Sequence, residues 1–323
     1  MASSTYISDL LRREPSKTFW GRLKGGDELS YPITLACTVS ILLIVALIVA
    51  ELWSHSQATV QKFGLGFLTS RTWDPNDGVF GALPFIYGTC VTSAVALLIA
   101  IPLGVAAAIF LAEMAPPKAS NLLTFLIELL AAVPSVIYGL LGIFVLLPII
   151  RDYLVPALRA AFGYVPLFSG PFYGVSLLSA GLVLSVMVVP FIISVSREVL
   201  LAVPTDQREA ALALGATKWE TTWDIVLPNA STGILGSVFL SLARALGETM
   251  AVTMVIGNTP KIAASLFSPG YSIAAVIANE FAEASGTLYI SSLIFLGLVL
   301  FGLTIVINAI ARILIIVTTR TAA

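Results

Sequence analysis

Residues 85–112 read FIYGTCVTSAVALLIAIPLGVAAAIFLA, a run without a single Asp, Glu, Lys or Arg. Roughly 20 apolar residues in an α-helix are enough to cross the hydrocarbon core of a bilayer. This run therefore predicts a membrane-spanning helix. Five further segments are long and apolar enough to do the same, at residues 33–53, 122–150, 174–196, 233–256 and 289–317. The expected fold class is all-α, a polytopic membrane protein with six transmembrane helices.

The composition of the whole chain agrees with this assignment. Of 323 residues, 58% are hydrophobic and 11% are charged, and the mean hydropathy is +0.98. Soluble globular proteins carry about 25% charged residues, so a chain this poor in charge could not cover a water-exposed surface. The net charge of −1 and the lack of a Lys/Arg tract argue against a nucleic-acid partner. Membrane lipid is the expected surrounding.

The residues that usually carry catalysis or bind metals are sparse. Cys37 and Cys90 both fall in apolar runs, which argues against a disulfide framework. His55 is the only histidine and has no ligand cluster around it. No Gly-Lys dipeptide occurs, so the chain has no P-loop for ATP, and hydrolase motifs are absent as well. We expect a non-catalytic chain without cofactor or metal; any ATP hydrolysis must come from another subunit.

Charge outside the spans predicts the orientation. The first span follows some thirty mostly polar residues and is too long for the apolar core of a signal peptide, so an uncleaved anchor is expected. Eleven Lys and Arg residues fall on the side of the two termini and five on the other side. The positive-inside rule then predicts that both termini are cytoplasmic.

Two stretches depart from a simple helix pattern. Residues 69–84 are rich in turn formers and predict an external loop that leads into the second span. Pro134-Ser135 and Gly139 interrupt the third span. Such residues are tolerated at membrane depth where neighbouring helices or a cavity satisfy the backbone. A packing kink and a bend that lines a pathway are equally compatible with this pattern.

The loop between the fourth and fifth spans is the first candidate for function. Residues 204–228 read PTDQREAALALGATKWETTWDIVLP. Asp206 followed by Glu209 predicts a capped helix start, and Gly215 permits a left-handed turn at the helix end. A second short helix is expected from about Thr217 to just before Pro228. The resulting helix–turn–helix suits docking of a partner in a groove, or equally an amphipathic connector on the headgroups.

The same loop resembles the EAA signature of ABC importer permeases, Glu-Ala-Ala-x3-Gly-x9-Ile-x-Leu-Pro. Every defined position is present, at Glu209, Ala210, Ala211, Gly215, Ile225, Leu227 and Pro228. The resemblance implies that this loop is the coupling element that sits in a cleft of a separate ATPase subunit.

The second candidate lies inside the fifth span, where residues 242–252 read LARALGETMAV. In a continuous helix Arg244 and Glu248 are neighbours on one face. Charges at this depth are costly unless paired or hydrated, and typically face a bundle interior or an aqueous cavity. The pair could be a structural ion pair. Alternatively, the planar guanidinium of Arg244 could bind an oxyanion with two hydrogen bonds, with Glu248 as the competing partner of a gate.

Residues 242–252 also resemble the corresponding stretch of phosphate ABC importer permeases. Residues 128–139, ELLAAVPSVIYG, are similar to another region of that family, and Trp73-Asp-Pro with residues 80–89 resembles its PstC branch rather than PstA. The resemblance covers nearly the whole chain from residue 30. The residues expected to line the substrate pathway are Arg244, Glu248, Ser135, Tyr138 and Thr249.

The resemblance implies a type I ABC importer permease (MetI-like) fold in a bacterial inner membrane. Residues 1–30 would form a basic cytoplasmic tail, 31–84 the first transmembrane helix and external loop, and 85–323 a five-helix core containing the loop 204–228. The implied partners are a PstA-like second permease, a PstB-like ATPase dimer and an external PstS-like phosphate-binding protein. Alternatives are a permease for sulfate, molybdate or phosphonate, a secondary transporter or channel with a proton relay, and a membrane scaffold.

Overall fold

The computed structural model describes residues 27–321 as an all-helical protein, without a β-strand in this range apart from one isolated bridge between Asp74 and Val79. Six helical segments within this range are long and apolar enough to cross a membrane, which is the number predicted from the sequence. The third and fifth of them are Ser135–Phe162 and Lys218–Gly247, not the predicted 122–150 and 233–256. Most of the tail expected at residues 1–30 lies outside the described residues. The chain divides into two compact units, residues 1–54 and 55–323.

The first unit is helix α3, which runs from Asp27 to His55, where the second unit begins. It contains the first predicted span, residues 33–53. Pro32 is the sixth residue of this helix, so its missing N–H removes one bond of the helical ladder.

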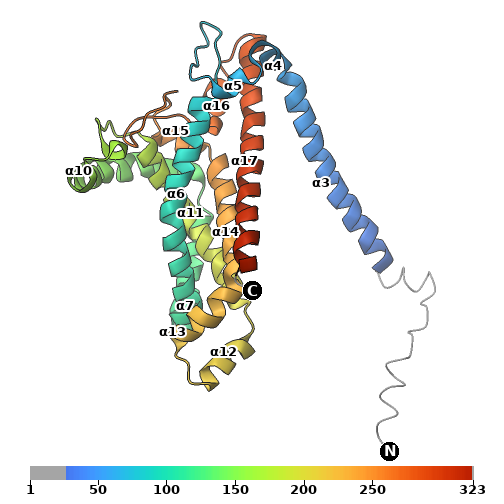
Figure 1. Ribbon diagram of the computed structural model, residues 1–323, viewed down its shortest axis with the longest axis vertical. Coiled ribbons are helices and arrows are strands. Elements are labelled where there is room, and N and C mark those ends of the chain that lie inside the picture. The colour runs from blue at the N-terminus through green and yellow to red at the C-terminus, as the bar shows by residue number, and fades with distance from the viewer. Residues whose placement is uncertain (1–26, 322–323) are drawn as a thin grey trace, which may run out of the picture. The chain divides into compact units, whose positions relative to one another are not determined.

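Four long helices run side by side in the second unit (Figure 1). Helix α11 contacts α6 most extensively and also packs against α14, which in turn contacts α17. Glycines allow close approach: an added Cβ at Gly181 would lie 2.5 Å from Cγ1 of Val95, and one at Gly104 would lie 2.7 Å from Cγ2 of Ile192. The bounds are α6 Leu83–Ile109, α11 Leu177–Leu201, α14 Leu227–Gly247 and α17 Thr287–Thr321.

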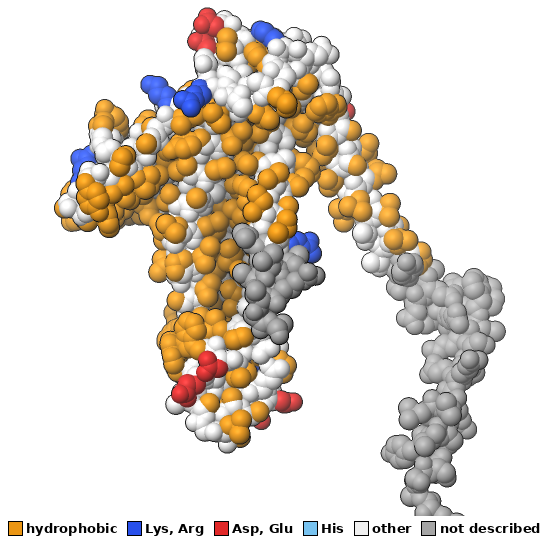
Figure 2. All heavy atoms as spheres, in the orientation of Figure 1, with side chains coloured by type: hydrophobic (Ala, Val, Ile, Leu, Met, Phe, Trp, Pro, Cys, Tyr) orange, Lys and Arg blue, Asp and Glu red, His pale blue; other side chains and the backbone are white. Residues whose placement is uncertain are grey.

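Space-filling atoms show how charge is distributed on this unit. On its visible face, apolar side chains cover much of the length of the helices, and the acidic side chains in view lie toward the two ends (Figure 2). That pattern fits a helical bundle surrounded by hydrocarbon over its middle part.

The third predicted span, residues 122–150, is not one helix. Helix α7 ends at Ala131 and α8 begins at Ser135, so the helix is interrupted at Pro134, as the sequence predicted. Proline lacks the N–H for the helical ladder and disfavours helical backbone at the residue before it. The helical path then continues beyond the predicted end. Its elements are α7 Pro117–Ala131, α8 Ser135–Leu141, η2 Gly142–Leu146, α9 Leu147–Ile149, η3 Ile150–Leu154 and α10 Val155–Phe162.

Three of the prolines inside helical paths follow a π-helical turn, whereas Pro102 and Pro190 lie inside the α-helices α6 and α11 without one. Pro148 follows η2, Pro156 follows η3, and Pro228 follows η5 (Thr221–Val226), each as the second residue of the next α-helical segment. A π turn forms hydrogen bonds to the fifth residue along. This wider turn helps the helix to pass a nitrogen that cannot donate. Another π turn, η1 (Phe110–Met114), extends α6.

The fifth predicted span is also interrupted. Helix α14 begins at Leu227, directly after η5, and ends at Gly247. Glu248 has extended backbone (φ −69°, ψ 128°), and a short helix, α15 (Met250–Val255), follows. The expected helix over 233–256 is therefore two helices with a break at residues 248–249.

The opposite end of the second unit from η5 is held by aromatic packing. Short helices α4 (Gln57–Phe63), α5 (Gly66–Thr69) and α16 (Ile273–Glu280) gather there (Figure 1). The indole N–H of Trp73 and the hydroxyl of Tyr289 both donate to Oε2 of Glu280, at 2.9 and 2.7 Å. These bonds fix the irregular segment 70–82, which the sequence predicted as a loop. Burial raises the pKa of nearby Tyr271 to about 12, so its phenol stays neutral.

Candidate coupling surface and substrate pathway

The loop between α11 and α14 begins with helix α12 (Thr205–Ala213). The predicted cap at Asp206 is wrong: Pro204 occupies the capping position, Asp206 lies in the first turn, and no side chain caps the helix. Helix α12 starts at Thr205, two residues earlier than a cap at Asp206 requires, because Pro204 already has the non-helical backbone of a capping position (φ −56°, ψ 135°). Asp206 can still favour the helix through its charge near the positive helix N-terminus.

The left-handed turn predicted at Gly215 is confirmed, with a φ of +92°. The Gly215 N–H donates to the Leu212 carbonyl at 3.0 Å, and the Ala216 N–H donates to the Ala211 carbonyl at 3.1 Å. Together these two bonds form a Schellman motif, which satisfies the last carbonyls of α12. The turn sends the chain back along α12.

The second helix of the loop starts with a capping box that the sequence analysis missed. The Glu220 N–H donates to Oγ1 of Thr217 at 3.3 Å, while the Thr217 N–H donates to Oε2 of Glu220 at 2.7 Å. The Thr-x-x-Glu spacing at residues 217–220 is a readable sign of this motif. This helix, α13 (Lys218–Glu220), continues through η5 into α14. The expectation that it stops before Pro228 is wrong, because the π turn accommodates the proline.

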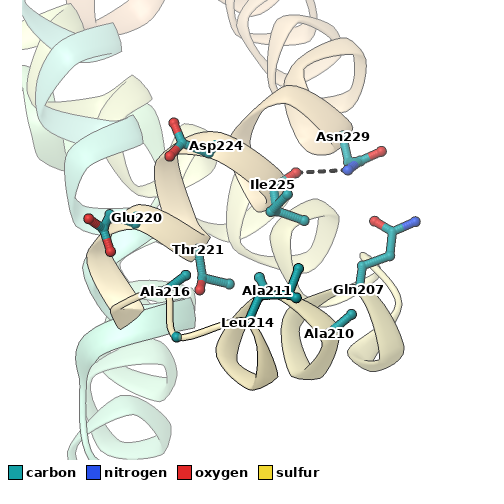
Figure 3. A pocket seen from close by; sticks show the side chains of 11 residues that line it. Gln207, Ala210, Ala211, Leu214, Ala216, Glu220, Thr221, Asp224, Ile225 and Asn229 are labelled. Carbon is teal, nitrogen blue, oxygen red and sulfur yellow. Dashed lines mark hydrogen bonds between the residues drawn. The ribbon is translucent and has the colours of Figure 1, made fainter.

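The two helices of the loop enclose a groove of about 670 Å³ between α12 and the α13–η5 segment (Figure 3). Four residues of the EAA signature meet in it although ten to fifteen residues separate the two segments: Ala210, Ala211, Gly215 and Ile225. The other lining residues are Gln207, Leu214, Ala216, Glu220, Thr221, Asp224 and Asn229. Of the remaining signature residues, Glu209 and Pro228 are exposed outside the lining, and Leu227 packs against the core.

The chemistry of the groove suits a protein partner. Its lining is mostly apolar and includes two carboxylates, Glu220 and Asp224, but no Lys or Arg. Leu214 stands 90% exposed beside it. An exposed large apolar residue next to an apolar groove is typical of an interaction surface. The surface matches a partner with an apolar projection flanked by basic groups.

The second candidate site corrects the expected pairing of Arg244 with Glu248. No ion pair joins these two side chains in the described part of the chain. Because α14 ends at Gly247, Glu248 is not one helical turn above Arg244; its carboxylate instead accepts a hydrogen bond from the Ala251 N–H at 3.2 Å, at the start of α15. Arg244 is exposed, with its guanidinium carbon 5.6 Å from the ring centre of Phe191.

The breaks in the third and fifth spans lie beside each other. Helix α8 packs on α15, where an added Cβ at Gly139 would lie 3.2 Å from Cα of Ala251. The hydroxyl of the buried Tyr138 donates to the Leu130 carbonyl across the first break at 2.6 Å. Tyr138 belongs to one apolar cluster with Ala245, the neighbour of Arg244 in the chain. The structure therefore brings Tyr138 and Arg244 to one region.

The other residues that the sequence analysis assigned to the pathway lie at the two breaks. Ser135 is half-buried as the first residue of α8. The half-buried Thr249 donates its hydroxyl to the Gly247 carbonyl at 3.3 Å. Both side chains are small and polar.

Comparison with known proteins identifies the family. A profile described as "Binding-protein-dependent transport system inner membrane component" matches residues 100–315. The chain is 46% identical to the phosphate transport system permease protein PstC of Mesorhizobium japonicum, over 88% of this chain and 89% of that protein. It is 47% identical to PstC of Xylella fastidiosa, over 87% and 88% of the two chains. The chain belongs to the PstC family of binding-protein-dependent permeases.

Solved structures agree on the fold of this permease. A crystal structure of a bacterial ABC transporter involved in the import of the acidic polysaccharide alginate superimposes with a TM-score of 0.56 at 16% identity, covering 91% of this chain and 98% of that one. The permease is thus a multi-pass membrane protein with the ABC importer fold. Membership in this family implies that it works with an ATPase and with a substrate-binding protein.

Proposed function

We propose that this permease forms one half of the translocation pathway of an ATP-driven importer of inorganic phosphate. The observation that carries the proposal is the 46–47% identity to PstC phosphate permeases over nearly nine-tenths of both chains. Similarity that extends over the helices, the breaks and the loop favours a shared substrate as well as a shared fold.

Arg244 is the central residue of the proposed pathway. Its guanidinium is exposed and free of Glu248, so it can offer two parallel N–H donors to a phosphate oxygen pair. Glu248, Ser135, Tyr138 and Thr249 would lie around the same opening. The missing ion pair simplifies the mechanism, because a phosphate ion need not displace a carboxylate to reach the arginine. Alternating access would expose this region first outward and then inward.

The groove between α12 and η5 is the proposed contact with the ATPase. Glu209, Ala210, Ala211, Gly215 and Ile225 would form the docking surface, and Leu227 and Pro228 would join it to α14. The 204–228 loop and both termini would then lie in the cytoplasm, in line with the distribution of Lys and Arg. Residues 31–84 would contain the first transmembrane helix and an external loop, and residues 85–323 would form the permease core.

The proposed assembly contains four kinds of subunit. A PstA-like permease would supply the other side of the pathway, because Arg244 is exposed on this chain and needs an opposing wall. Two PstB-like ATPases would drive the cycle, and a PstS-like protein would deliver phosphate outside. The membrane would be the bacterial inner membrane.

Uptake of radiolabelled phosphate tests the proposal in cells that lack other phosphate transporters and express this permease with its three partners. ATP depletion should stop uptake, whereas collapse of the proton gradient at constant ATP should not. Excess sulfate, molybdate or phosphonate should compete poorly. Uptake that follows the proton gradient would favour a secondary transporter, and preferential uptake of another oxyanion would refute the assignment of phosphate.

A further inference from the structure

Arg208 makes three side-chain contacts that tie helix α12 to the transmembrane helices. Its Nη2 donates to Oε1 of Glu113 at 3.0 Å and to the Leu200 carbonyl at 2.7 Å, and its Nη1 donates to the Val203 carbonyl. The Arg208 and Glu113 side chains are only 17% and 13% exposed. This is a nearly buried ion pair between residues 95 positions apart in the chain.

The groups that Arg208 contacts lie at the ends of α6 and α11. Glu113 lies in η1, at the end of α6, and Leu200 lies in the last turn of α11. Leu200 and Val203 are buried in one apolar cluster together with Leu111 of η1. Because α6 and α11 share the most extensive helix contact of the structure, Arg208 binds to two helices that act as one body.

Helix α12 has little else to hold it. None of its residues is buried, and its helix-to-helix contacts are chiefly with η5 across the groove. A force applied to the exposed face of α12 can reach α14 through the Gly215 turn and the contact with η5. It can reach α6 and α11 by two routes, along the backbone or through Arg208. The backbone route runs through the short connection 202–204, to which Arg208 is also bonded at Val203.

The chemistry of this contact requires arginine. The planar guanidinium carries five N–H donors and can serve a carboxylate and two carbonyls together. The carbonyls at the end of α11 carry the partial negative charge of a helix C-terminus, which favours a cation. A lysine keeps the charge but lacks the fork, so it cannot reproduce all three contacts.

We propose that Arg208 is a positioning residue that transmits the displacement of α12 by the ATPase to α6 and α11, through Glu113 and the end of α11. The inference rests on the proposed function of α12 as the docking helix. It assigns the transmission of motion to one side chain that forms no part of the groove lining. Loss of Arg208 should leave docking intact and separate ATP hydrolysis from transport.

The test uses the complete transporter in proteoliposomes and measures phosphate imported per ATP hydrolysed. Arg208→Gln should assemble and hydrolyse ATP when the binding protein is present, yet import at least tenfold less phosphate per ATP. Arg208→Lys should recover part of this loss, and Glu113→Gln, whose amide oxygen can still accept one bond, should be intermediate. Arg197→Gln is the matched control, because Arg197 has a 13% exposed side chain near the same end of α11 but pairs with its neighbour Glu198. The amount of phosphate that Arg197→Gln imports per ATP hydrolysed should equal that of the wild type.

Hydrogen exchange provides a second measurement. In the wild type, trapping the ATPase in its closed state should change exchange in both 205–213 and 110–114. In Arg208→Gln the first change should remain and the second should disappear. The inference would be overturned if Arg208→Gln imported as much phosphate per ATP as the wild type. It would also be overturned if exchange in Arg208→Gln still changed in both segments as it does in the wild type. A wild-type complex that imports no phosphate would instead refute the proposed function.

Discussion

Replacing Gly215 tests whether the geometry of the turn between α12 and α13 governs coupling. At a φ of +92°, an L-residue is strained, whereas no atom lies within 4 Å of an added Cβ. The cost of Gly215→Ala is therefore conformational rather than steric, about 2 kcal/mol for the left-handed region. Gly215→Val should cost about 3 kcal/mol because it is β-branched. Gly215→Asn should cost less than alanine, since asparagine tolerates this conformation better.

These costs lower the fraction of molecules in which the loop is turned correctly for docking. A penalty of about 2 kcal/mol lowers the ratio of correctly turned to misdirected loop roughly 30-fold. ATP hydrolysis stimulated by the binding protein should decline in the order Gly, Asn, Ala, Val, while the membrane subunits still assemble. The measurement is stimulated ATPase activity of the purified complex in proteoliposomes, normalised to complex abundance.

Gly302→Ala is the matched control for this series. Gly302 lies in α17, and an added Cβ there also has no atom within 4 Å. Its backbone is helical, so alanine should stabilise the helix by up to about 1 kcal/mol and leave coupling unchanged. Wild-type stimulated hydrolysis in Gly215→Val would refute the reasoning, because the strained turn would then have no role in coupling.

Four further changes have clear expected outcomes. Arg244→Lys keeps the charge but loses the fork, so phosphate uptake should drop severely at normal membrane abundance; normal uptake would contradict oxyanion binding. A reporter that is active only outside the cytoplasm should stay silent when fused to Ala323, and activity would reverse the topology. Gly88→Ala places a Cβ 2.1 Å from the Tyr271 carbonyl oxygen, so it should destabilise the protein by about 1–3 kcal/mol in thermal unfolding, whereas the control Gly302→Ala should not destabilise it. This permease with its ATPase and binding protein, but without a second permease, should not transport; activity would exclude the heterodimer.

The number of spanning helices could be predicted from the sequence, but their continuity could not. Hydropathy measures how apolar a stretch of residues is and carries no information on its backbone conformation. Two of the predicted spans therefore include residues on both sides of a break. The break before Ser135 carried a signal in Pro134, which the sequence analysis noted. The break at Glu248 carried one in Gly247, the last residue of α14 and a residue type that often ends helices, but the sequence analysis did not use it.

The geometry of the 204–228 loop was predicted better than the pairing of Arg244. Gly215 gave the correct turn because the αL requirement is local and glycine is its usual solution. The expected Arg244–Glu248 pair failed because it assumed an unbroken helix. The contact of Arg208 with Glu113 was not predicted at all: the sequence analysis counted Arg208 only as a topological charge, and an ion pair between distant residues leaves no pattern in one sequence.

The π turn ahead of Pro228 also restricts how this loop can vary in length. Adding or removing one residue in a helical segment rotates the preceding part of the helix by about 100° about the helix axis, relative to the part that follows. A deletion within 221–226 would rotate α13 and α12 away from their present side of α14 and would set Pro228 into an ordinary α-helical ladder, where its missing donor is costly. Insertions and deletions are therefore expected to be rare between Gly215 and Pro228, and more frequent in exposed turns such as residues 75–78.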